Sequence, residues 1–353
     1  EVLALRADGD LFVPLLGDKA ELFCLTGDGF EHEVRICDTR AWNWHKGARQ
    51  AWVDDDNIIF NSVKDGFLGS SVFSITSGQI KDLDFPIDTL SPSGRTATTF
   101  SYFDLEQSMP GYGYRFLTDG DVRERLPART GLYEVDIPTN TVTQLVSMDK
   151  ILEQSDLPDD SEHYHFFTHT QYSYCGRLVF FFLRAVEALD ITKRKTELWV
   201  LNKLNGVVTR APTDGMVSHY HVSSEGFVVA YASVNGRDGH YVFNGEDLSL
   251  IKCLEDKLLV YDGHHHFLGL NSDEFLVDSY PDRDRYATIK KVSIEDVNVT
   301  TCVSVKAPRS FRPPSHRHHW SCDLHPRTNR AGDKLCFDST HTGKRSLCIG
   351  DIN

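Results

Sequence analysis

The segment YSYCGRLVFFFL (residues 172–183), followed by ELWVLNKLNG (residues 197–206), contains one unit of a structural repeat. A turn of small residues precedes an apolar strand, a variable connection follows, and a second apolar strand ends in a Leu-Asn-Gly turn. Short β-branched and aromatic runs between Gly, Asp, Asn and Ser are typical of strands and turns. This segment therefore predicts a β-sheet unit.

The same unit recurs along the chain. Further copies occupy residues 52–78, 90–137, 221–243, 270–277 and 330–349. They are spaced by roughly 40 to 80 residues, which is the spacing of the blades of a β-propeller. Together with the N-terminal residues 11–36, the copies predict an all-β fold, a seven-bladed β-propeller.

The ends of the chain bear on how the ring closes. The chain ends on an expected inner strand, so we expect the N-terminal strands to complete the last blade, which would remove exposed sheet edges. Two β-sandwiches are the alternative, but no Pro/Gly/Ser-rich linker separates two halves. We therefore expect a single domain over residues 1–353.

Charge and hydropathy exclude some classes of function. The 353 residues contain 37 Lys and Arg against 51 Asp and Glu, a formal net charge of −14. An acidic protein lacks the basic footprint of general nucleic-acid binding, and a polyanionic substrate would need a locally positive pocket. The longest strongly apolar run, residues 178–183, is far shorter than the ~20 residues of a membrane-spanning helix.

Eight cysteines are too few for a disulfide scaffold. The chain begins with Glu1 instead of Met, and we expect a secreted or periplasmic protein whose leader has been removed.

The sixteen histidines are unevenly placed. Several precede the turns that begin the blades, where a propeller would gather them at one mouth of its central channel. Each one taken alone is equally a hydrogen-bonded or solvent-facing side chain. The histidines concerned are His45, His163, His165, His169, His219, His221, His264 to His266, His316, His318, His319 and His325.

A metal site is predicted near the C-terminus. Cys322 and His325 have the spacing C-x₂-H, Cys336 follows on an expected strand, and His264 is the candidate fourth ligand from the preceding blade. Thiolates with imidazole suit Zn²⁺, which prefers tetrahedral nitrogen and sulfur ligands. A closed set of four ligands would be structural, and an open position would make the site catalytic. The alternative for Cys336 is a buried thiol in a strand core.

Several motifs resemble one group of known proteins. They are WNWHKG (42–47), QAW (50–52), PGYGY (110–114), TH (168–169), LR (183–184), GMVSH (215–219), DGH (262–264), DSYPD (278–282), CDLHPR (322–327) and CFDS (336–339). Together they resemble the seven-bladed propeller polysaccharide lyases, the oligogalacturonate lyases and ulvan lyases. The resemblance covers most of the chain from Trp42 onward.

The resemblance implies β-elimination of a polysaccharide that contains uronic acid. Such a reaction needs a cation to neutralise the uronate carboxylate, a base to remove the C5 proton, and an acid to protonate O4 as it leaves. The implied partner is an acidic polysaccharide or oligosaccharide. We expect the protein to be a monomer.

By this resemblance, six residues are candidates for the reaction. His45 would be a general acid or charge partner, Tyr114 the base, and His219 a base or an acid. Arg129 would hold the carboxylate, and His169 would lie near the channel mouth with Arg184, a second carboxylate clamp. The structural alternatives are packing beside Trp44 for His45, a core aromatic for Tyr114 and a loop ion pair for Arg129.

The sequence also departs from the group. His45 replaces a usual Gln, Thr168 replaces a usual Asn, and Cys322 stands at a Gln position of the oligogalacturonate lyase ligand set. Because sulfur favours zinc over manganese, we expect a structural Zn²⁺ that braces the last two blades. The competing function is a non-catalytic propeller, similar to TolB, that binds a glycan or a protein. A propeller hydrolase is disfavoured because no Gly-x-Ser-x-Gly motif occurs.

Overall fold

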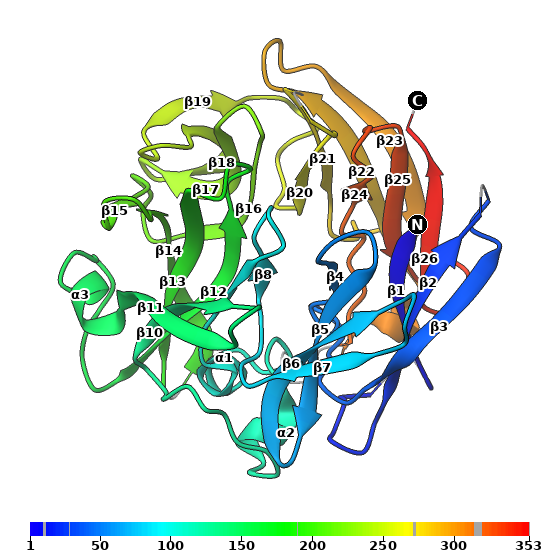
Figure 1. Cartoon of the computed structure of the whole chain (residues 1–353). Coiled ribbons are helices and arrows are strands. Elements are labelled where there is room, and N and C mark those ends of the chain that lie inside the picture. Colours follow the sequence, from blue (N-terminus) through cyan, green and yellow to red (C-terminus); the bar gives the residue numbers. More distant parts are fainter. Residues whose placement is uncertain (10–11, 28, 189, 271–272, 314–319, 353) are drawn as a thin grey trace.

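A computed structural model describes residues 1–9, 12–27, 29–188, 190–270, 273–313 and 320–352. Seven β-sheets stand around a central axis, as the blades of a propeller (Figure 1). The predicted all-β, seven-bladed fold is therefore confirmed.

Each sheet is an antiparallel meander whose strands follow one another in the chain. The first two sheets contain β1 (Val2–Ala7), β2 (Ala20–Thr26), β3 (His32–Thr39), and β4 (Ala51–Trp52), β5 (Asn57–Lys64), β6 (Phe67–Ser74), β7 (Ile80–Leu83). The third and fourth contain β8 (Thr89–Leu90), β9 (Thr96–Thr99), β10 (Gly131–Asp136), β11 (Thr141–Ser147), and β12 (His163–Tyr172), β13 (Leu178–Glu187), β14 (Asp190–Asn202), β15 (Val207–Arg210). The fifth and sixth contain β16 (Val217–Val222), β17 (Phe227–Val234), β18 (Arg237–Asn244), β19 (Leu250–Leu254), and β20 (His265–Phe267), β21 (Glu274–Asp278), β22 (Tyr286–Ser293), β23 (Val299–Lys306). The seventh contains β24 (Arg327–Thr328), β25 (Lys334–Ser339) and β26 (Ser346–Asp351).

Strand β13 shows why the chain folds into packed blades. It is apolar on both faces, and Phe180, Phe181 and Phe182 are fully buried. Because side chains alternate along a strand, Phe181 packs with the third sheet, whereas Phe180 and Phe182 pack with the fifth. A continuous apolar run is what a strand buried on both faces requires, and here the two faces meet two neighbouring blades.

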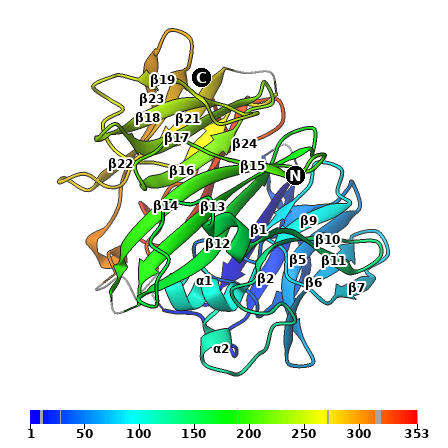
Figure 2. The ribbon, with the colours of Figure 1, turned by 90° about the vertical axis from the view of Figure 1, so that its left-hand side faces the viewer.

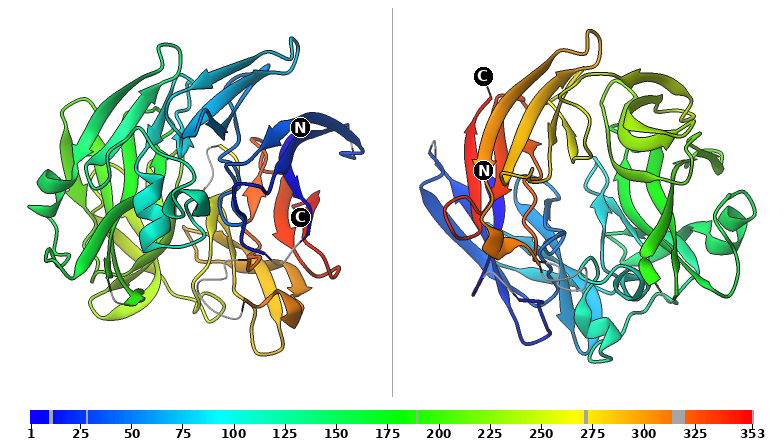
Figure 3. Two further views of the ribbon diagram at one scale, coloured as in Figure 1. Left: turned by 90° about the horizontal axis from the view of Figure 1, so that it is seen from below. Right: turned by 180° about the vertical axis from the view of Figure 1, so that it is seen from behind.

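The closure of the ring differs from the sequence expectation. Strands β1, β2 and β3 form a three-stranded sheet of their own, and the last sheet contains only β24, β25 and β26. No pairing between the N-terminal strands and the last blade occurs among the described residues. The two sheets lie next to each other in the ring (Figures 1 and 3). The first and last blades therefore meet as separate sheets.

Helical structure is confined to connections. The long connection from β9 to β10 carries α1 (Tyr102–Ser108) and α2 (Arg115–Thr118), which lie close to each other in Figure 2. Helix α3 (Met148–Leu152) follows β11, and a 3₁₀ turn (Arg309–Phe311) follows β23. No helix among the described residues is long and apolar enough to cross a membrane.

Candidate functional site

A cavity of about 750 Å³ lies inside the ring and is lined mainly by the inner strands and the loops that lead into them. Eight of the sixteen histidines line it. They are His45, His169, His219, His221, His264, His265, His266 and His325. Residues far apart in the sequence thus share one opening, which makes this cavity the candidate site. His316, His318 and His319 lie outside the described residues.

The structure brings together some of the predicted site residues and separates others. His45, His169, His219, His264, Cys322 and His325 line the cavity. The remaining four, Tyr114, Arg129, Arg184 and Cys336, do not line it.

Tyr114 is a core residue. Its side chain is 1% exposed, its hydroxyl accepts a hydrogen bond from Asn61 Nδ2 at 2.9 Å, and its ring stacks on Tyr102. Burial raises its pKa above the ordinary range. A base must reach the substrate, so the structure supports the alternative of a core aromatic for Tyr114.

The two arginines also differ from their expected places. Arg129 is exposed, and its guanidinium lies 4.7 Å from the ring centroid of Tyr164 on β12. Arg184 is 2% exposed and lies behind the cavity wall, where it contacts Met109 Sδ at 3.1 Å and the Ser218 carbonyl at 3.4 Å. Burial lowers the pKa of Arg184, and the nearby Arg194 lowers it further. Neither guanidinium reaches the cavity surface.

His169 and His219 occupy matching positions in consecutive blades. Strand β12 has a register shift between Thr168 and Gln171, and β16 has one between Val217 and His219. His169 also has a φ of +53°. Such irregularities re-aim side chains and are common next to active sites. Here they turn both imidazoles toward the cavity.

His219 is held by a carboxylate. Its Nδ1 lies 3.0 Å from Asp262 Oδ1, and Ser218 Oγ donates to the other Asp262 oxygen at 2.6 Å. Burial lowers the pKa of His219, and the neighbouring His264 lowers it further despite Asp262. A neutral imidazole whose Nδ1 donates to a carboxylate leaves Nε2 as the basic nitrogen.

Tyr112, from the connection between β9 and β10, lines the cavity beside His45. The two rings stack at 4.3 Å with an interplanar angle of 5°. Asn43 fixes both: its Oδ1 accepts from the backbone N–H of His45 at 3.1 Å, and its Nδ2 donates to the Tyr112 carbonyl at 3.2 Å. Burial raises the pKa of Tyr112 to about 12, so its phenol is protonated at neutral pH.

A buried ion pair supports the cavity wall near His169. Lys46 Nζ lies 2.9 Å from Asp88 Oδ1, and Arg49 Nε lies 3.4 Å from the same oxygen. The other oxygen of Asp88 accepts from the backbone and hydroxyl of Thr170. Burial lowers the pKa of Lys46 to about 8, although Asp88 opposes this shift. The network ties the second, third and fourth blades together at the cavity.

The structure gathers two of the histidines of the predicted metal site with Asp323, and not with the predicted cysteines. One donor atom from each of His264, Asp323 and His325 lies within 4.8 Å of the other two. Neither Cys322 nor Cys336 belongs to this group, and burial raises the pKa of their thiols to about 12 and about 11. Both sulfurs are therefore protonated at neutral pH, and the group contains imidazole nitrogens and one carboxylate.

The alternation of side chains explains why Asp323 joins this group. Leu324 is 3% exposed and packs in the core with Leu276, whereas its neighbours Asp323 and His325 face the cavity. Residues two apart share a side where side chains alternate in this way, so Asp323 and His325 both face the cavity. Cys336 lies on β25 opposite Arg327.

Asp278 orients the two histidines of this group. Its Oδ1 lies 3.0 Å from His264 Nδ1, and its Oδ2 accepts from the backbone N–H of His325 at 2.9 Å. Burial alone would lower the pKa of His264, but Asp278 outweighs it and the pKa is raised. A carboxylate behind a histidine is the usual support of a metal ligand. The donor set of two nitrogens and one carboxylate oxygen suits Mn²⁺ or Zn²⁺.

The group of three lies where the sixth and seventh sheets meet, because His264 precedes β20 and His325 precedes β24. All three side chains also line the cavity. The sequence analysis missed Asp323, Tyr112 and Lys46. For Asp323 the spacing of two from His325 was the available signal, and for Tyr112 it was its place as the first tyrosine of the Gly-Tyr-Gly-Tyr motif.

No protein-family model matches the chain, and no curated protein matches its sequence. Among solved structures, it is similar to oligogalacturonate lyase from Vibrio parahaemolyticus, with a TM-score of 0.53 and 11% identity over 100% of this chain and 98% of that one. It is also similar to the tricorn protease, with a TM-score of 0.54 and 11% identity over 100% of this chain and 35% of that one. TolB from Acinetobacter baumannii gives a TM-score of 0.44 and 10% identity over 83% of this chain.

These comparisons concern the fold alone. The chain is a seven-bladed β-propeller, and two of the neighbours with a TM-score above 0.5 are named as a lyase and a protease. It spans 62% of the TolB chain and 35% of the tricorn protease.

Proposed function

We propose that the protein is a lyase that cleaves a uronic-acid-containing glycan by β-elimination in the histidine-lined cavity. The observation that carries the proposal is the adjacency of His219, paired with Asp262, to the group of His264, Asp323 and His325. The rings of His219 and His264 lie 3.9 Å apart. The proposed reaction needs such a base beside a site for a carboxylate-neutralising cation.

In this proposal His264, Asp323 and His325 hold a divalent cation of the manganese or zinc type. When bound, the cation neutralises the uronate carboxylate and thereby acidifies the adjacent C5–H. Asp278 keeps His264 and His325 in place through the contacts described above. The oligogalacturonate lyase similarity is compatible with this chemistry but rests on fold alone.

We assign the base to His219. Its Nδ1 is engaged by Asp262, so Nε2 takes the C5 proton and the resulting imidazolium is stabilised by the carboxylate. The low pKa of the buried ring keeps it unprotonated before reaction at neutral pH. His169, whose pKa burial also lowers, lies on the neighbouring blade and shapes the same wall.

We assign the acid to Tyr112. Its phenol is protonated at neutral pH and lines the cavity next to His45 and within 6.4 Å of His169, measured between ring centroids. The electron pair of the broken C5–H bond forms the C4–C5 double bond, the C4–O4 bond breaks, and O4 takes the Tyr112 proton. The proton removed by His219 returns to Tyr112 through solvent after product release, which balances the cycle.

Substrates of this kind occur outside the cytoplasm, in keeping with a secreted or periplasmic protein.

The test follows the absorbance of unsaturated uronate products. Pectin fragments, ulvan and glycosaminoglycans are incubated with protein supplied with Mn²⁺ or Zn²⁺, and with the variants His219→Asn and Cys336→Ser. We expect one glycan to give a rise in absorbance that is lost in His219→Asn and kept in Cys336→Ser. Glycan binding without any rise across the panel would instead favour a non-catalytic propeller of the TolB kind.

A further inference from the structure

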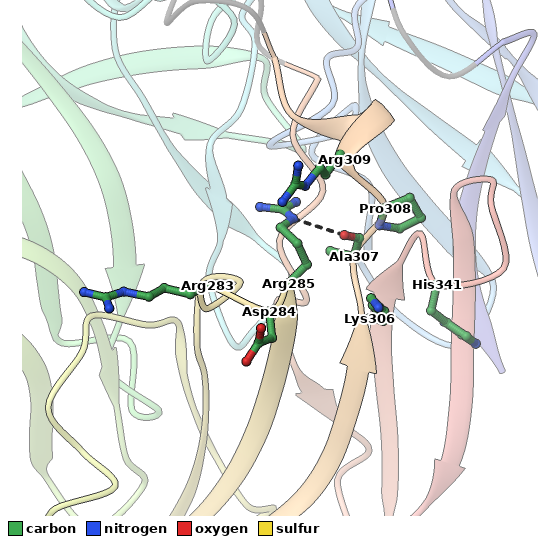
Figure 4. Close-up of a pocket in the computed structure, with 8 residues that line it drawn as sticks. All are labelled: Arg283, Asp284, Arg285, Lys306, Ala307, Pro308, Arg309 and His341. Atoms are coloured by element: carbon green, nitrogen blue, oxygen red, sulfur yellow. Dashed lines mark hydrogen bonds between the residues drawn. The ribbon is translucent and has the colours of Figure 1, made fainter.

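A second pocket, of about 550 Å³, lies outside the histidine-lined cavity (Figure 4). It is formed by the loop before β22, the end of β23 and the residues that follow, and the turn between β25 and β26. Its cationic side chains are Arg283, Arg285, Lys306 and Arg309, and its one carboxylate is Asp284. In a chain with a net charge of −14, this is a local excess of positive charge.

The four cations are not neutralised by neighbouring carboxylates. Within the part of the chain that the structure describes, no carboxylate lies within ion-pair distance of Arg283, Arg285, Lys306 or Arg309. Elsewhere on the surface, exposed arginines such as Arg237 and Arg327 are paired. Figure 4 shows the guanidinium groups of Arg285 and Arg309 directed to the same part of the pocket. Two guanidinium groups held side by side without a counter-ion favour binding of an anion. The Arg283 side chain extends away from these two in Figure 4.

The pocket is built on a fixed turn. Asp282 Oδ1 accepts from the backbone N–H of Tyr286 at 2.8 Å, and the Arg285 backbone N–H donates to the Asp282 carbonyl at 3.1 Å. Arg285 has a φ of +70°, a conformation that non-glycine residues adopt rarely. Its Nε donates to the Ala307 carbonyl at 3.1 Å, which leaves the two terminal nitrogens for a ligand.

The same loop connects this pocket to the histidine-lined cavity. It starts at Asp278, which supports His264 and His325, and it includes Tyr280, whose ring lies 6.1 Å from that of His264. Arg283 and Arg285 follow a few residues later. A chain-like ligand in the cavity that extends along this loop would therefore meet the cations next.

We infer that the pocket of Arg283, Arg285, Lys306 and Arg309 is a distal subsite that binds a carboxylate or sulfate group of an extended acidic glycan. The choice of a glycan as occupant rests on the proposed function. Planar guanidinium groups bind carboxylate and sulfate oxygens in pairs. The subsite favours long substrates over short ones, because a short substrate that fills the cavity does not reach it.

The test measures binding by calorimetry in a His219→Asn background, so that the glycan is not consumed. The test variant is Arg285→Gln with Arg309→Gln, and the matched control is Arg177→Gln with Arg237→Gln, which removes the same charge from arginines paired with Glu246 and Glu255. The probes are long and short oligogalacturonates, a sulfated glycan, inorganic sulfate and single-stranded DNA.

We expect the test variant to bind the long or sulfated glycan about tenfold or more weakly, a loss of about 1.4 kcal/mol or more, and to bind the short probe unchanged. The control variant keeps the binding of both. Lys306→Gln with Arg309→Gln repeats the test without changing the bond from Arg285 to Ala307.

Equal losses in test and control variants, equal losses for long and short probes, or tighter binding of DNA than of any glycan would overturn the inference. A selective loss of long-glycan binding in a protein that cleaves no glycan would uphold the subsite and reject the proposed lyase. Cleavage with an unaffected test variant would reject the subsite alone.

Discussion

At the residue scale, the proposed cation binding should depend most on Asp323, because this residue supplies the only anionic donor in the group with His264 and His325. Burial raises its pKa to about 6, so it is largely ionised at neutral pH. Asp323→Asn removes the charge and keeps the shape. We expect it to weaken Mn²⁺ or Zn²⁺ binding by about 100-fold or more, measured by calorimetry and elemental analysis.

Cys336→Ser is the matched control, since its thiol lies outside the group. It should leave the metal content unchanged. Loss of the metal in Cys336→Ser, together with its retention in Asp323→Asn, would restore the cysteine ligands of the sequence analysis and refute the group observed here.

A second residue-scale prediction concerns Asp262, the partner of His219 Nδ1 at 3.0 Å. Asp262→Asn presents a donor or a weaker acceptor, so the imidazole loses its fixed tautomer. Turnover should fall by about 10²- to 10⁴-fold while KM stays nearly unchanged. Steady-state kinetics checks this, and Ser218→Ala, which removes a donor to the same carboxylate, should have a much smaller effect. Wild-type turnover in Asp262→Asn would remove His219 from the role of base.

The sequence could identify a site residue only where the spacing of a motif determines which residues become neighbours in the fold. His325 was predicted from the C-x₂-H spacing and His264 from its place in the preceding blade, and the ring brings these two positions together at the cavity. Tyr114 was chosen over Tyr112 because the sequence does not say which of two nearby rings turns inward. A hydrogen bond from Asn61, which lies more than fifty residues away in the sequence, holds the Tyr114 hydroxyl in the core. No local sequence pattern contains that contact.

At the element scale, the connection that carries α1 and Tyr112 depends on a buried carboxyl group. Glu106 is 3% exposed, and its Oε2 accepts from the Gly111 backbone N–H at 2.9 Å. Burial raises its pKa from 4.5 to about 7. The folded state therefore holds a proton that the unfolded chain releases above about pH 4.5. This contribution to stability is full below that pH and is lost as pH rises through about 7.

Glu106→Gln is neutral at every pH and tests this. The variant should match the wild type near about pH 4 and exceed it near about pH 8, by up to about 3 kcal/mol in the free energy of unfolding. Urea titrations across this range measure the difference, with the exposed Glu225→Gln as control. A difference that does not change with pH would show that Glu106 is ionised in the folded protein throughout.

The blades themselves were predictable because each is a local unit with its own turns and strands. The run of residues 178–183, apolar on both faces, already required neighbours on both sides, and the structure provides them. The helical insertion between β9 and β10 was missed because its stability comes from packing against β12, not from helix propensity. The closure was misjudged because two three-stranded sheets that meet are not distinguishable in sequence from one shared sheet.

At the scale of the whole molecule, net charge and local charge oppose each other for the proposed substrate. The chain carries a formal charge of −14, which repels a polyuronate at long range. The cations that would hold the glycan line the two pockets and act only at short range. Salt screens the distant repulsion first, because the Debye length falls from about 30 Å at 0.01 M to about 10 Å at 0.1 M. We expect kcat/KM for a long polyuronate to rise several-fold between these concentrations and to decline at higher salt, as contacts within the site are screened in turn. Initial rates against sodium chloride at fixed pH measure this, and a short uronate, which carries less charge, should show a shallower rise. A decline that begins at the lowest salt would mean that local attraction dominates at every distance, so the acidic surface would have no part in selecting the substrate.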